Sequence, residues 1–303
     1  MYKVQILMSS YNGSKYIKRQ IESIMNQEDV ITYLFIRDDG SSDNTVDIIK
    51  DLKIIYHERI ELIEGNNIGW KKSFMQLLYS SGDFEYFGFS DQDDVWFPNK
   101  LTTLIRLMEE DTEFNGVKLA HSNSLTVNPD FSVKKEQEIR REKPISHKSA
   151  IVTEYFQGCG MLWNRIAMDM IKKYMPMEDG IAHDFWVGII GYIFGKVYFS
   201  KEPLFYHIRY GNNSSADGNV LKGRFSRLIN ILLSKNAYMN PAKDLLVGYG
   251  EELNVDFQKF LYRLTDYKFS YKSKILLIFD NEFVRTSTIS TVFMKFAILI
   301  NRF

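Results

Sequence analysis

An acidic run at residues 90–96, SDQDDVW, has the clearest chemistry in this sequence. Three carboxylates, those of Asp91, Asp93 and Asp94, fall within four positions, where they repel one another unless a cation lies among them. Carboxylate oxygens are the ligands that Mg²⁺ and Mn²⁺ prefer in proteins. The run therefore predicts a divalent metal site. The alternative is an acidic turn that caps a helix, but a cap needs one acid and this run has three.

The residues on either side of the acidic run indicate which elements position it. The aromatic stretch at 84–89 is typical of a buried strand, and Pro98 is suited to the first position of a helix. The carboxylates then lie on a strand-to-helix turn. Open parallel sheets bind their ligands at such turns.

Short β-like runs alternate with helical stretches through the first part of the chain. The predicted elements are residues 4–8, 14–26, 33–36, 45–52, 60–63, 70–80 and 86–89. Alternation of this kind predicts an α/β fold, with a mostly parallel sheet covered by helices on both faces. Asp43 and Asn44 are placed to cap the helix that begins near residue 45.

The chain has 303 residues, of which 45% are hydrophobic and 25% charged, as in an ordinary globular protein. Its formal net charge is zero, but residues 201–303 carry 15 Lys and Arg against 9 Asp and Glu. This basic end favours anionic lipid or an acidic partner, and we expect no nucleic acid partner. The single Cys159 excludes an internal disulfide framework and a cysteine-rich zinc site, and it fits a reducing compartment.

The pattern becomes helical after residue 218, and we place a domain boundary near residue 215. The clearest helical stretches are 225–233, 241–248, 257–264 and 291–300. The C-terminal region of residues 216–303 combines lysines with apolar runs, which suits a membrane surface. Packing on the first domain or on a second copy of the chain explains the same apolar faces equally well.

Three motifs, LMSSYNG at 7–13, RDDGSSDNT at 37–45 and the acidic run, occur in the order and spacing of a known family. Together they resemble family 2 glycosyltransferases of the GT-A fold. The SDQDDVW form is similar to bacterial rhamnosyltransferases that build cell-wall or O-antigen polysaccharides. The resemblance covers about residues 1–215. It implies a nucleotide-sugar donor and a Mn²⁺ or Mg²⁺ cofactor.

The resemblance implies roles for individual residues around the nucleotide. Without the resemblance, a strand end with a tight turn explains Asp39 as well as ligand binding does. For the region of Gly69 and Lys72, a turn before a basic helix is a better explanation than ligand binding. The resemblance implies that these residues hold the nucleotide sugar, with Lys72 near the diphosphate. The full donor set that it implies is Ser9, Tyr11, Asn12, Asp39, Gly69, Lys72, Asp91, Gln92, Gln157, Gly158 and Arg209.

The same resemblance implies the metal ligands. Asp93 is expected to be a direct ligand, and Asp91 a ligand or a ribose contact. The sequence YHIRYGNN at 206–213 departs from the Tyr-Arg-x-His-x-Asn-Asn of many rhamnosyltransferases, since it has Tyr210 where the histidine is expected. We take His207 as the third metal ligand. A buried core histidine is the alternative interpretation of His207.

The sequence HDFW at 183–186 resembles the family's His-Asp-x-Trp element, in which the carboxylate is the general base. Without the resemblance, Asp184 would be interpreted as a helix cap. With it, Asp184 is expected to remove the proton of the acceptor hydroxyl as the nucleotide leaves. This direct displacement inverts the anomeric configuration. The glycines around Cys159 allow a close backbone approach to a ligand, and strand-to-helix packing explains them equally well.

These inferences predict an inverting, metal-dependent glycosyltransferase that moves L-rhamnose from dTDP-L-rhamnose to a growing, lipid-linked saccharide. We expect it in the cytoplasm, on the inner face of the plasma membrane, with a homo-oligomer as an open alternative. A family 2 enzyme that uses a UDP-hexose is the nearest rival. A nucleotide-sugar-binding scaffold without turnover is a rival of another class, which Asp91, Asp93 and Asp184 argue against.

Overall fold

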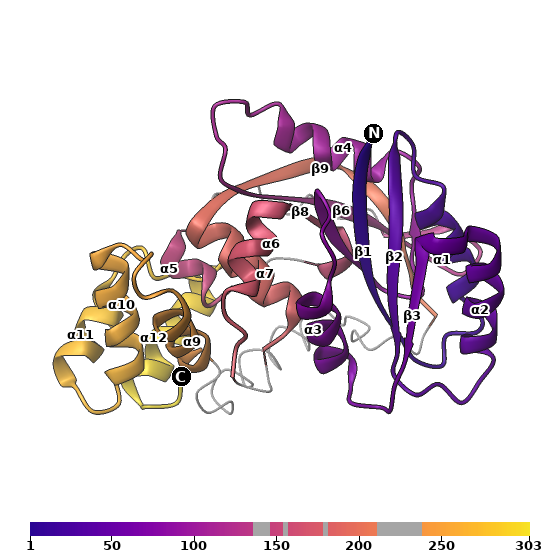
Figure 1. Cartoon of the computed structure of the whole chain (residues 1–303). Helices are drawn as coiled ribbons and strands as arrows, with labels where there is room; N and C mark the ends of the chain where they lie inside the picture. Colours follow the sequence, from indigo (N-terminus) through magenta and orange to yellow (C-terminus); the bar gives the residue numbers. More distant parts are fainter. Residues whose placement is uncertain (136–145, 154–156, 178–180, 211–237) are drawn as a thin grey trace. The chain divides into compact units, whose positions relative to one another are not determined.

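The computed structural model describes residues 1–135, 146–153, 157–177, 181–210 and 238–303 (Figure 1). The chain divides into two compact units. The first contains Met1–Glu142, Phe156–Lys172 and Ala182–Tyr210, and the second contains Lys143–Tyr155, Lys173–Ile181 and Gly211–Phe303. The predicted boundary at residue 215 and the predicted helix at 225–233 lie outside the described residues.

One sheet forms the centre of the first unit, with its described strands in the order β3-β2-β1-β4-β8-β6-β9-β5, and β7 beside β6. The strands are β1 Tyr2–Ser10, β2 Val30–Asp38, β3 Ile60–Glu64, β4 Tyr86–Ser90, β5 Val95–Trp96, β6 Val117–Val127, β7 Val133–Lys135, β8 Met161–Asn164 and β9 Gly195–Ile208. The strands β1 to β4 pair in parallel. Because β8 is antiparallel to both β4 and β6, β6 runs in the same direction as β4. The predicted mostly parallel α/β sheet is confirmed.

Helices cover both faces of this sheet. They are α1 Ile17–Met25, α2 Thr45–Tyr56, α3 Trp70–Ser80, α4 Lys100–Glu109, α6 Arg165–Lys172 and α7 His183–Phe194, with the short helices η1 His57–Arg59 and η2 Gly158–Gly160. The helices α1, α2 and α4 pack on the face of β1 that carries Val4, Ile6 and Met8. The helices α3, α6 and α7 contact the sheet and one another away from that core. Strands covered on both faces are apolar over most of their length, which explains the nearly continuous apolar runs in the sequence.

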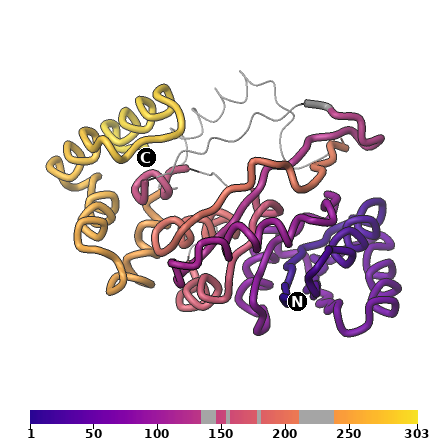
Figure 2. Tube along the Cα trace, turned by 90° about the horizontal axis from the view of Figure 1, so that it is seen from above, coloured from indigo at the N-terminus to yellow at the C-terminus, as the bar shows by residue number. Residues whose placement is uncertain are grey.

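The strands β6 and β9 run side by side in parallel for most of their length, as Figure 2 also shows. Their register shifts on either side of Asn123, where β9 passes through Pro203. A proline cannot donate to the ladder, and an irregularity of this kind bends a strand. The bend precedes the segment of β9 that carries His207.

The second unit is helical in its described part. It contains α5 His147–Ala150, α9 Met239–Tyr249, α10 Val255–Asp266, α11 Tyr271–Phe279 and α12 Thr288–Leu299. Four of these helices start at a side-chain cap, in which Ser146, Asn254, Ser270 and Ser287 each accept the backbone N–H three residues later. The core includes Phe260, Phe283 and Phe303, with the Tyr267 hydroxyl donating to the Phe303 carbonyl at 2.7 Å. Among the described residues, we find no helix with the length and apolar character to cross a membrane.

Candidate active site

The carboxyl ends of β1, β2 and β4 meet at one edge of the sheet. Ser10 lies opposite Asp38 in the register of β1 with β2, and Met8 lies opposite Ser90 in that of β1 with β4. The residues that follow these positions are therefore neighbours. In this way the fold brings together the three motifs that are far apart in the sequence.

The Asp39 carboxylate is held inside the protein. It is 2% exposed, and its Oδ1 lies 2.5 Å from Nη1 of Arg37. Its two oxygens also accept the backbone N–H groups of Ile68 at 2.8 Å and Gly69 at 2.9 Å. Gly69 has φ +85°, a conformation that favours glycine. Asp39 thus fixes the loop before α3. The resemblance implied only a nucleotide contact for Asp39 and not this structural role.

Arg37 is a site residue that the sequence reasoning missed. Its guanidinium is buried and donates to the Gln76 side chain at 2.8 Å and to the Asn66 carbonyl at 2.9 Å. A Cβ added to Gly65 would lie 2.5 Å from Nη2 of Arg37, so the loop approaches the guanidinium closely. The alternation of residues along β2 could have indicated an inward-pointing arginine, but not its partners.

Gln92 and Tyr11 are joined by two reciprocal hydrogen bonds. The Tyr11 N–H donates to Oε1 of Gln92 at 3.0 Å, and Nε2 of Gln92 donates to the Tyr11 carbonyl at 3.0 Å. A Cβ added to Gly13 would lie 2.2 Å from Oε1 of Gln92, so only glycine leaves room for this amide. The Tyr11 ring itself is exposed. It is therefore available to lie against a planar ligand.

The loop after β1 is fixed to the start of α2 by further polar contacts. The Asn12 N–H donates to Oγ of Ser41 at 2.9 Å, and Oδ1 of Asn12 accepts the Ser42 N–H at 2.8 Å. Asn12 has φ 47°, which asparagine tolerates better than most residues. The Ser9 hydroxyl donates to Oγ of Ser73 on α3 at 2.7 Å. Ser9 and Asn12 thus support the exposed Tyr11.

The acidic run folds into a cluster around Asp94, a residue that our predicted site did not include. The ligand atoms of Asp91, Asp94 and Cys159 all lie within 4.8 Å of one another. Nδ1 of His207 lies 2.9 Å from Oδ1 of Asp94, while Oδ2 of Asp94 is buried with no hydrogen-bond partner. Asp93, the predicted direct ligand, is not a member of this group of three. Its surroundings include the charges of Asp94, His207 and Arg209.

Burial and mutual repulsion make these carboxylates hard to ionise. Burial, followed by the charges of Asp94 and Asp93, raises the pKa of Asp91 to about 7. Burial and the charge of Asp94 raise the pKa of Asp93 to about 6. Burial acts to lower the pKa of His207, but its hydrogen bond to Asp94 and the charge of that residue raise it overall. A cation among these groups would therefore be strongly favoured.

Lys100 is a second buried residue that the sequence did not reveal. It is the first residue of α4, and its side chain is fully buried. Its Nζ donates to the Cys159 carbonyl at 2.5 Å and lies 3.2 Å from the centre of the Trp96 ring. Burial lowers the pKa of Lys100 to about 7, against the attraction of Asp94 and Asp91. Lys100 thus holds the η2 turn beside the acidic cluster.

The residues of the cluster fit a hard divalent cation. Crowded carboxylates and the unpartnered Oδ2 of Asp94 offer oxygen ligands in a buried place. The Cys159 thiol does not add to them at neutral pH, because burial raises its pKa well above the ordinary value. Family 2 enzymes commonly use a divalent metal, and this donor set is consistent with Mg²⁺ or Mn²⁺.

Asp184 lies at the start of α7 beside an aromatic cage. The preceding His183 stacks on Phe74 with ring centres 3.9 Å apart and meets Phe89 edge-on at 4.4 Å. Burial lowers the pKa of His183 to about 3, so this ring is neutral and acts in packing. Burial raises the pKa of Asp184, and Oδ1 of Asp184 accepts the Phe185 N–H at 2.8 Å. The cage therefore holds His183 at the start of α7, next to Asp184.

The η2 turn brings Asp184 close to the acidic cluster. A Cβ added to Gly158 would lie 2.9 Å from Nε2 of His183 and 3.3 Å from Cβ of Asp184. The Sγ atom of the next residue, Cys159, lies within 4.8 Å of a carboxylate oxygen of Asp91 and of Asp94. Since consecutive Cα atoms are about 3.8 Å apart, a single peptide unit separates the surroundings of Asp184 from the cluster. Asp184 and the acids of the cluster thus lie next to consecutive residues of the η2 turn.

The remaining predicted residues lie around this site with different degrees of exposure. Gln157 precedes η2, and its Oε1 accepts the Ser124 hydroxyl at 3.2 Å. The backbone N–H of Arg209 donates to the Val127 carbonyl at 2.9 Å, while its charge acts on Asp93 and His207. Lys72 is exposed on α3. Its neighbour Lys71, which we did not predict, is the lysine whose charge acts on Asp184.

Tyr210, at the position where a histidine was expected, packs on α1. Its ring lies 3.9 Å from that of Tyr16, and its hydroxyl accepts Nη2 of Arg19 at 2.6 Å. The Arg19 guanidinium also lies 4.8 Å from the centre of the Phe131 ring. The end of β9 is thereby attached to α1, which positions His207 and Arg209 next to the acidic cluster.

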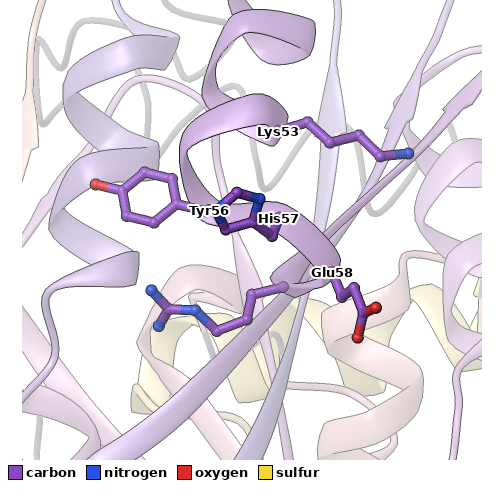
Figure 3. A pocket seen from close by; sticks show the side chains of 5 residues that line it. Lys53, Tyr56, His57 and Glu58 are labelled. Atoms are coloured by element: carbon purple, nitrogen blue, oxygen red, sulfur yellow. The ribbon is translucent and has the colours of Figure 1, made fainter.

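A separate surface hollow lies at the end of α2, lined by Lys53, Tyr56, His57, Glu58 and Arg59 (Figure 3). The strand β3 begins directly after these residues, at Ile60. Because β3 is parallel to β2, the hollow lies at the amino ends of the strands. It is at the opposite edge of the sheet from the acidic cluster and shares no residue with it.

Comparison with known proteins agrees with this geometry. The sequence profile of Glycosyl transferase family 2 matches residues 5–169, more than half of the chain. The chain belongs to glycosyl transferase family 2. The dTDP-rhamnosyl transferase RfbG of Shigella flexneri is 26% identical over 240 residues, which cover 73% of this chain and 78% of RfbG.

Two further relatives of this family 2 glycosyltransferase bear on its fold and chemistry. The UDP-Glc:alpha-D-GlcNAc-diphosphoundecaprenol beta-1,3-glucosyltransferase WfgD of Escherichia coli is 31% identical over 129 residues, 42% of this chain and 47% of WfgD. The crystal structure of S. aureus TarS 1-349 in complex with UDP-GlcNAc has a TM-score of 0.57 at 15% identity, covering 90% of this chain and 83% of that chain. The structural likeness confirms the GT-A fold.

Proposed function

We propose that this family 2 glycosyltransferase moves L-rhamnose from dTDP-L-rhamnose to a saccharide hydroxyl, with inversion at the anomeric carbon. The observation that carries the proposal is the η2 turn, where Gly158 lies against Asp184 and Cys159 lies against Asp91 and Asp94. A transfer reaction needs a base for the acceptor and charge compensation for the leaving group. The position of both groups beside the η2 turn supports the proposal.

The donor nucleotide is proposed to bind along the carboxyl ends of β1 and β2. The exposed Tyr11 ring is suited to lie against the base, and the bonds from Gln92 hold its backbone in place. Asp39 and Gly69 shape the opposite loop through their hydrogen bond. The wider set of Ser9, Asn12, Lys72, Gln157 and Arg209 surrounds the same region as proposed donor contacts.

Asp184 is proposed as the general base. Its carboxylate takes the proton of the acceptor hydroxyl while that oxygen bonds to the anomeric carbon. The bond from the anomeric carbon to the diphosphate oxygen breaks, and its electron pair leaves with dTDP. Attack from the face opposite the diphosphate produces the inverted configuration. His183 holds the base in position through its stacking on Phe74.

Asp91 and Asp94, with Asp93 and His207 beside them, are the residues that would hold Mn²⁺ or Mg²⁺. When bound there, the cation would supply positive charge beside the departing diphosphate. His207 and Lys100 then have supporting roles. His207 orients Asp94 through the 2.9 Å contact, and Lys100 holds the Cys159 carbonyl.

The identity of the sugar rests on the SDQDDVW motif and on the name of RfbG, a dTDP-rhamnosyl transferase. A UDP-hexose is the second candidate, because the name of WfgD gives UDP-Glc as its donor and TarS was crystallised with UDP-GlcNAc. The name of WfgD also gives a diphosphoundecaprenol-linked acceptor. We propose a lipid-linked saccharide acceptor here as well, which places the enzyme in the cytoplasm at the inner face of the membrane.

The proposal is tested by measuring nucleotide release from purified dTDP-L-rhamnose, UDP-glucose and UDP-GlcNAc with Mn²⁺ and an acceptor extract. We expect dTDP release above that of UDP, and a fall in kcat of about 10²–10⁴-fold for Asp184→Asn. Asp169→Asn, an exposed carboxylate on α6, is the matched control and should retain full activity. Unchanged turnover in Asp184→Asn would refute Asp184 as the base. If none of the three donors is turned over, the non-catalytic scaffold is favoured.

A further inference from the structure

The helix α11 exposes an apolar face. Tyr271, Ile275 and Phe279 recur at four-residue intervals on this helix, and Tyr271 and Phe279 are 83% and 76% exposed. Phe269, in the turn before the helix, is 88% exposed. The opposite side of α11 is the one that is buried, through Leu277. Large aromatic side chains in such positions increase the apolar area in contact with water.

The neighbouring helix α12 repeats this arrangement. Its exposed residues are apolar and recur at helical spacing, namely Ile289, Val292, Phe296, Leu299 and the adjoining Ile300. Lys295 joins the two helices, since its Nζ donates to the carbonyls of Leu277 at 2.5 Å and Asp280 at 2.9 Å. The two helices are therefore held together, and we call their exposed apolar residues the α11–α12 face. Exposed apolar residues gathered on neighbouring elements are typical of interaction sites.

The charged residues within the two helices have one sign, while Asp266 of α10 accepts the Ser273 hydroxyl of α11 at 3.5 Å. The two helices contain Lys272, Lys274 and Lys295 and no acidic residue. The nearest acids in sequence, Asp280 and Glu282, are both paired with Lys148. Lys268 and Arg302 adjoin the ends of the helices. An apolar surface whose own helices carry lysines and no acidic residue is complementary to anionic lipid headgroups above acyl chains.

We propose that the α11–α12 face binds an anionic lipid bilayer and holds the enzyme at the membrane where a lipid-linked acceptor lies. The acceptor part of this inference rests on the proposed function. The binding part rests only on the exposed apolar residues and the charges. Phe279 and Phe296 insert at the level of the headgroups, while Lys272 lies among the lipid phosphates.

A second copy of the chain fits this face less well. The commonest dimers pack the same patch on both subunits. Lys272 of each copy would then meet a face that has no carboxylate in either helix to pair with it. Like charges brought together in this way oppose association. Anionic lipid is therefore the occupant that the charges favour.

Flotation of the full-length protein with vesicles tests the proposal without sugar donor or turnover. We compare phosphatidylcholine vesicles with vesicles in which about a third of the lipid is phosphatidylglycerol, for the wild type and for Ile275→Ser/Phe279→Ser/Phe296→Ser. The matched control is Ile54→Ser/Ile55→Ser, which removes two exposed apolar side chains from α2 of the first unit. Circular dichroism and dTDP binding check that each variant is folded.

We expect the wild type and the control to float with anionic vesicles only, and the triple variant to bind at least about tenfold more weakly. Lys272→Gln, which removes no apolar area, should weaken binding about fivefold and reduce its dependence on salt. Equal flotation of the triple variant and the wild type would overturn the proposal. The proposal would also be overturned if the wild type were a dimer that does not bind vesicles and the triple variant were a monomer. Activity on a water-soluble acceptor does not require membrane binding. It therefore tests the proposed reaction independently of flotation.

Discussion

The two carboxylate oxygens of Asp94 have different surroundings. Oδ1 is paired with His207, and Oδ2 is buried without a partner. A buried acceptor that makes no hydrogen bond costs about 1–3 kcal/mol. Asp91 and Asp93 carry a related cost, since burial raises the pKa of both. Binding of a cation would remove both penalties, so the site is arranged to favour an occupied state.

The role of Asp94 leads to a prediction on metal affinity. Asp94→Asn keeps the shape of the side chain but removes its charge and alters the contact with His207. We expect the affinity for Mn²⁺ to fall about 10–100-fold, the usual effect of disturbing ligands or their supporting groups. Titration calorimetry with Mn²⁺ measures it. Asp47→Asn, an exposed carboxylate on α2, is the control. An unchanged Kd in Asp94→Asn would mean that the cluster does not hold the ion.

The pKa of Asp184 predicts the acid side of the pH profile. Burial raises this pKa above the ordinary value and outweighs the hydrogen bond from the Phe185 N–H. A general base must be ionised, so activity is lost as the pH falls through the raised pKa and is retained above it. The measurement is kcat over a pH series with saturating donor and metal. A rate that stays constant down to the pKa of an ordinary aspartate, about 4, would exclude Asp184 as the base.

At the scale of elements, the loop after β1 and the turn after β4 are connected through one amide. Gln92 bonds to both backbone groups of Tyr11, and Gly13 provides the space. Such a connection means that nucleotide binding depends on the acidic turn even where the nucleotide does not touch it. The fold thus links the donor loop to the proposed metal site.

A double-mutant cycle tests this connection. Gly13→Ala would place a Cβ against the Gln92 side chain, and Gln92→Ala removes the same amide. Each single change is expected to weaken dTDP binding by about 1 kcal/mol, because two hydrogen bonds are lost. The double variant should be little worse than either single one, since both act on one interaction. Effects on Kd that simply add would show that the glycine and the glutamine act separately.

The sequence predicted these elements well where burial is continuous. The central residues of β1, β2 and β4 are mostly apolar because helices cover both faces of these strands. The strands β6, β8 and β9 were harder to predict. Their pairing joins segments far apart in the chain, and the middle of β6 consists of the buried polar residues 121–124, which give no apolar run.

The site was predicted less completely, for reasons of geometry. The sequence places three acids on one turn, but it does not show that Asp94 is the buried one or that His207, 113 residues away, pairs with it. Lys100 was also missed, because a lysine in the first turn of a helix normally points to solvent. Only the tertiary structure shows that it reaches the Cys159 carbonyl. Contacts between distant segments determine these roles, and no local pattern records them.

At the scale of the whole molecule, each unit has a core of its own. That of the second unit depends on Phe303, which is buried, stacks on Tyr238 at 4.8 Å and accepts the Tyr267 hydroxyl through its carbonyl. The sheet of the first unit contains none of these residues. Damage to the second core should therefore leave the donor site intact.

Phe303→Ala tests this independence. Removal of a buried phenylalanine ring costs about 3–5 kcal/mol, so the second unit should open far more often. Hydrogen exchange is expected to accelerate in α10, α11 and α12 but not in β1, β2 or β4, and dTDP affinity should be unchanged. Ile300→Ala, at an exposed position nearby, is the control. Faster exchange throughout the sheet would show that the two units unfold together.

The division of the chain into units has a consequence for biosynthesis. The polypeptide passes from one unit to the other after residues 142, 155, 172, 181 and 210. A ribosome therefore delivers Lys143–Tyr155 and Lys173–Ile181 long before the C-terminal helices that belong with them. The sheet of the first unit can fold before the C-terminal helices that pack with these two segments have been synthesised. Premature termination after residue 210 would release a chain with two orphaned stretches, a natural target for chaperones and proteases.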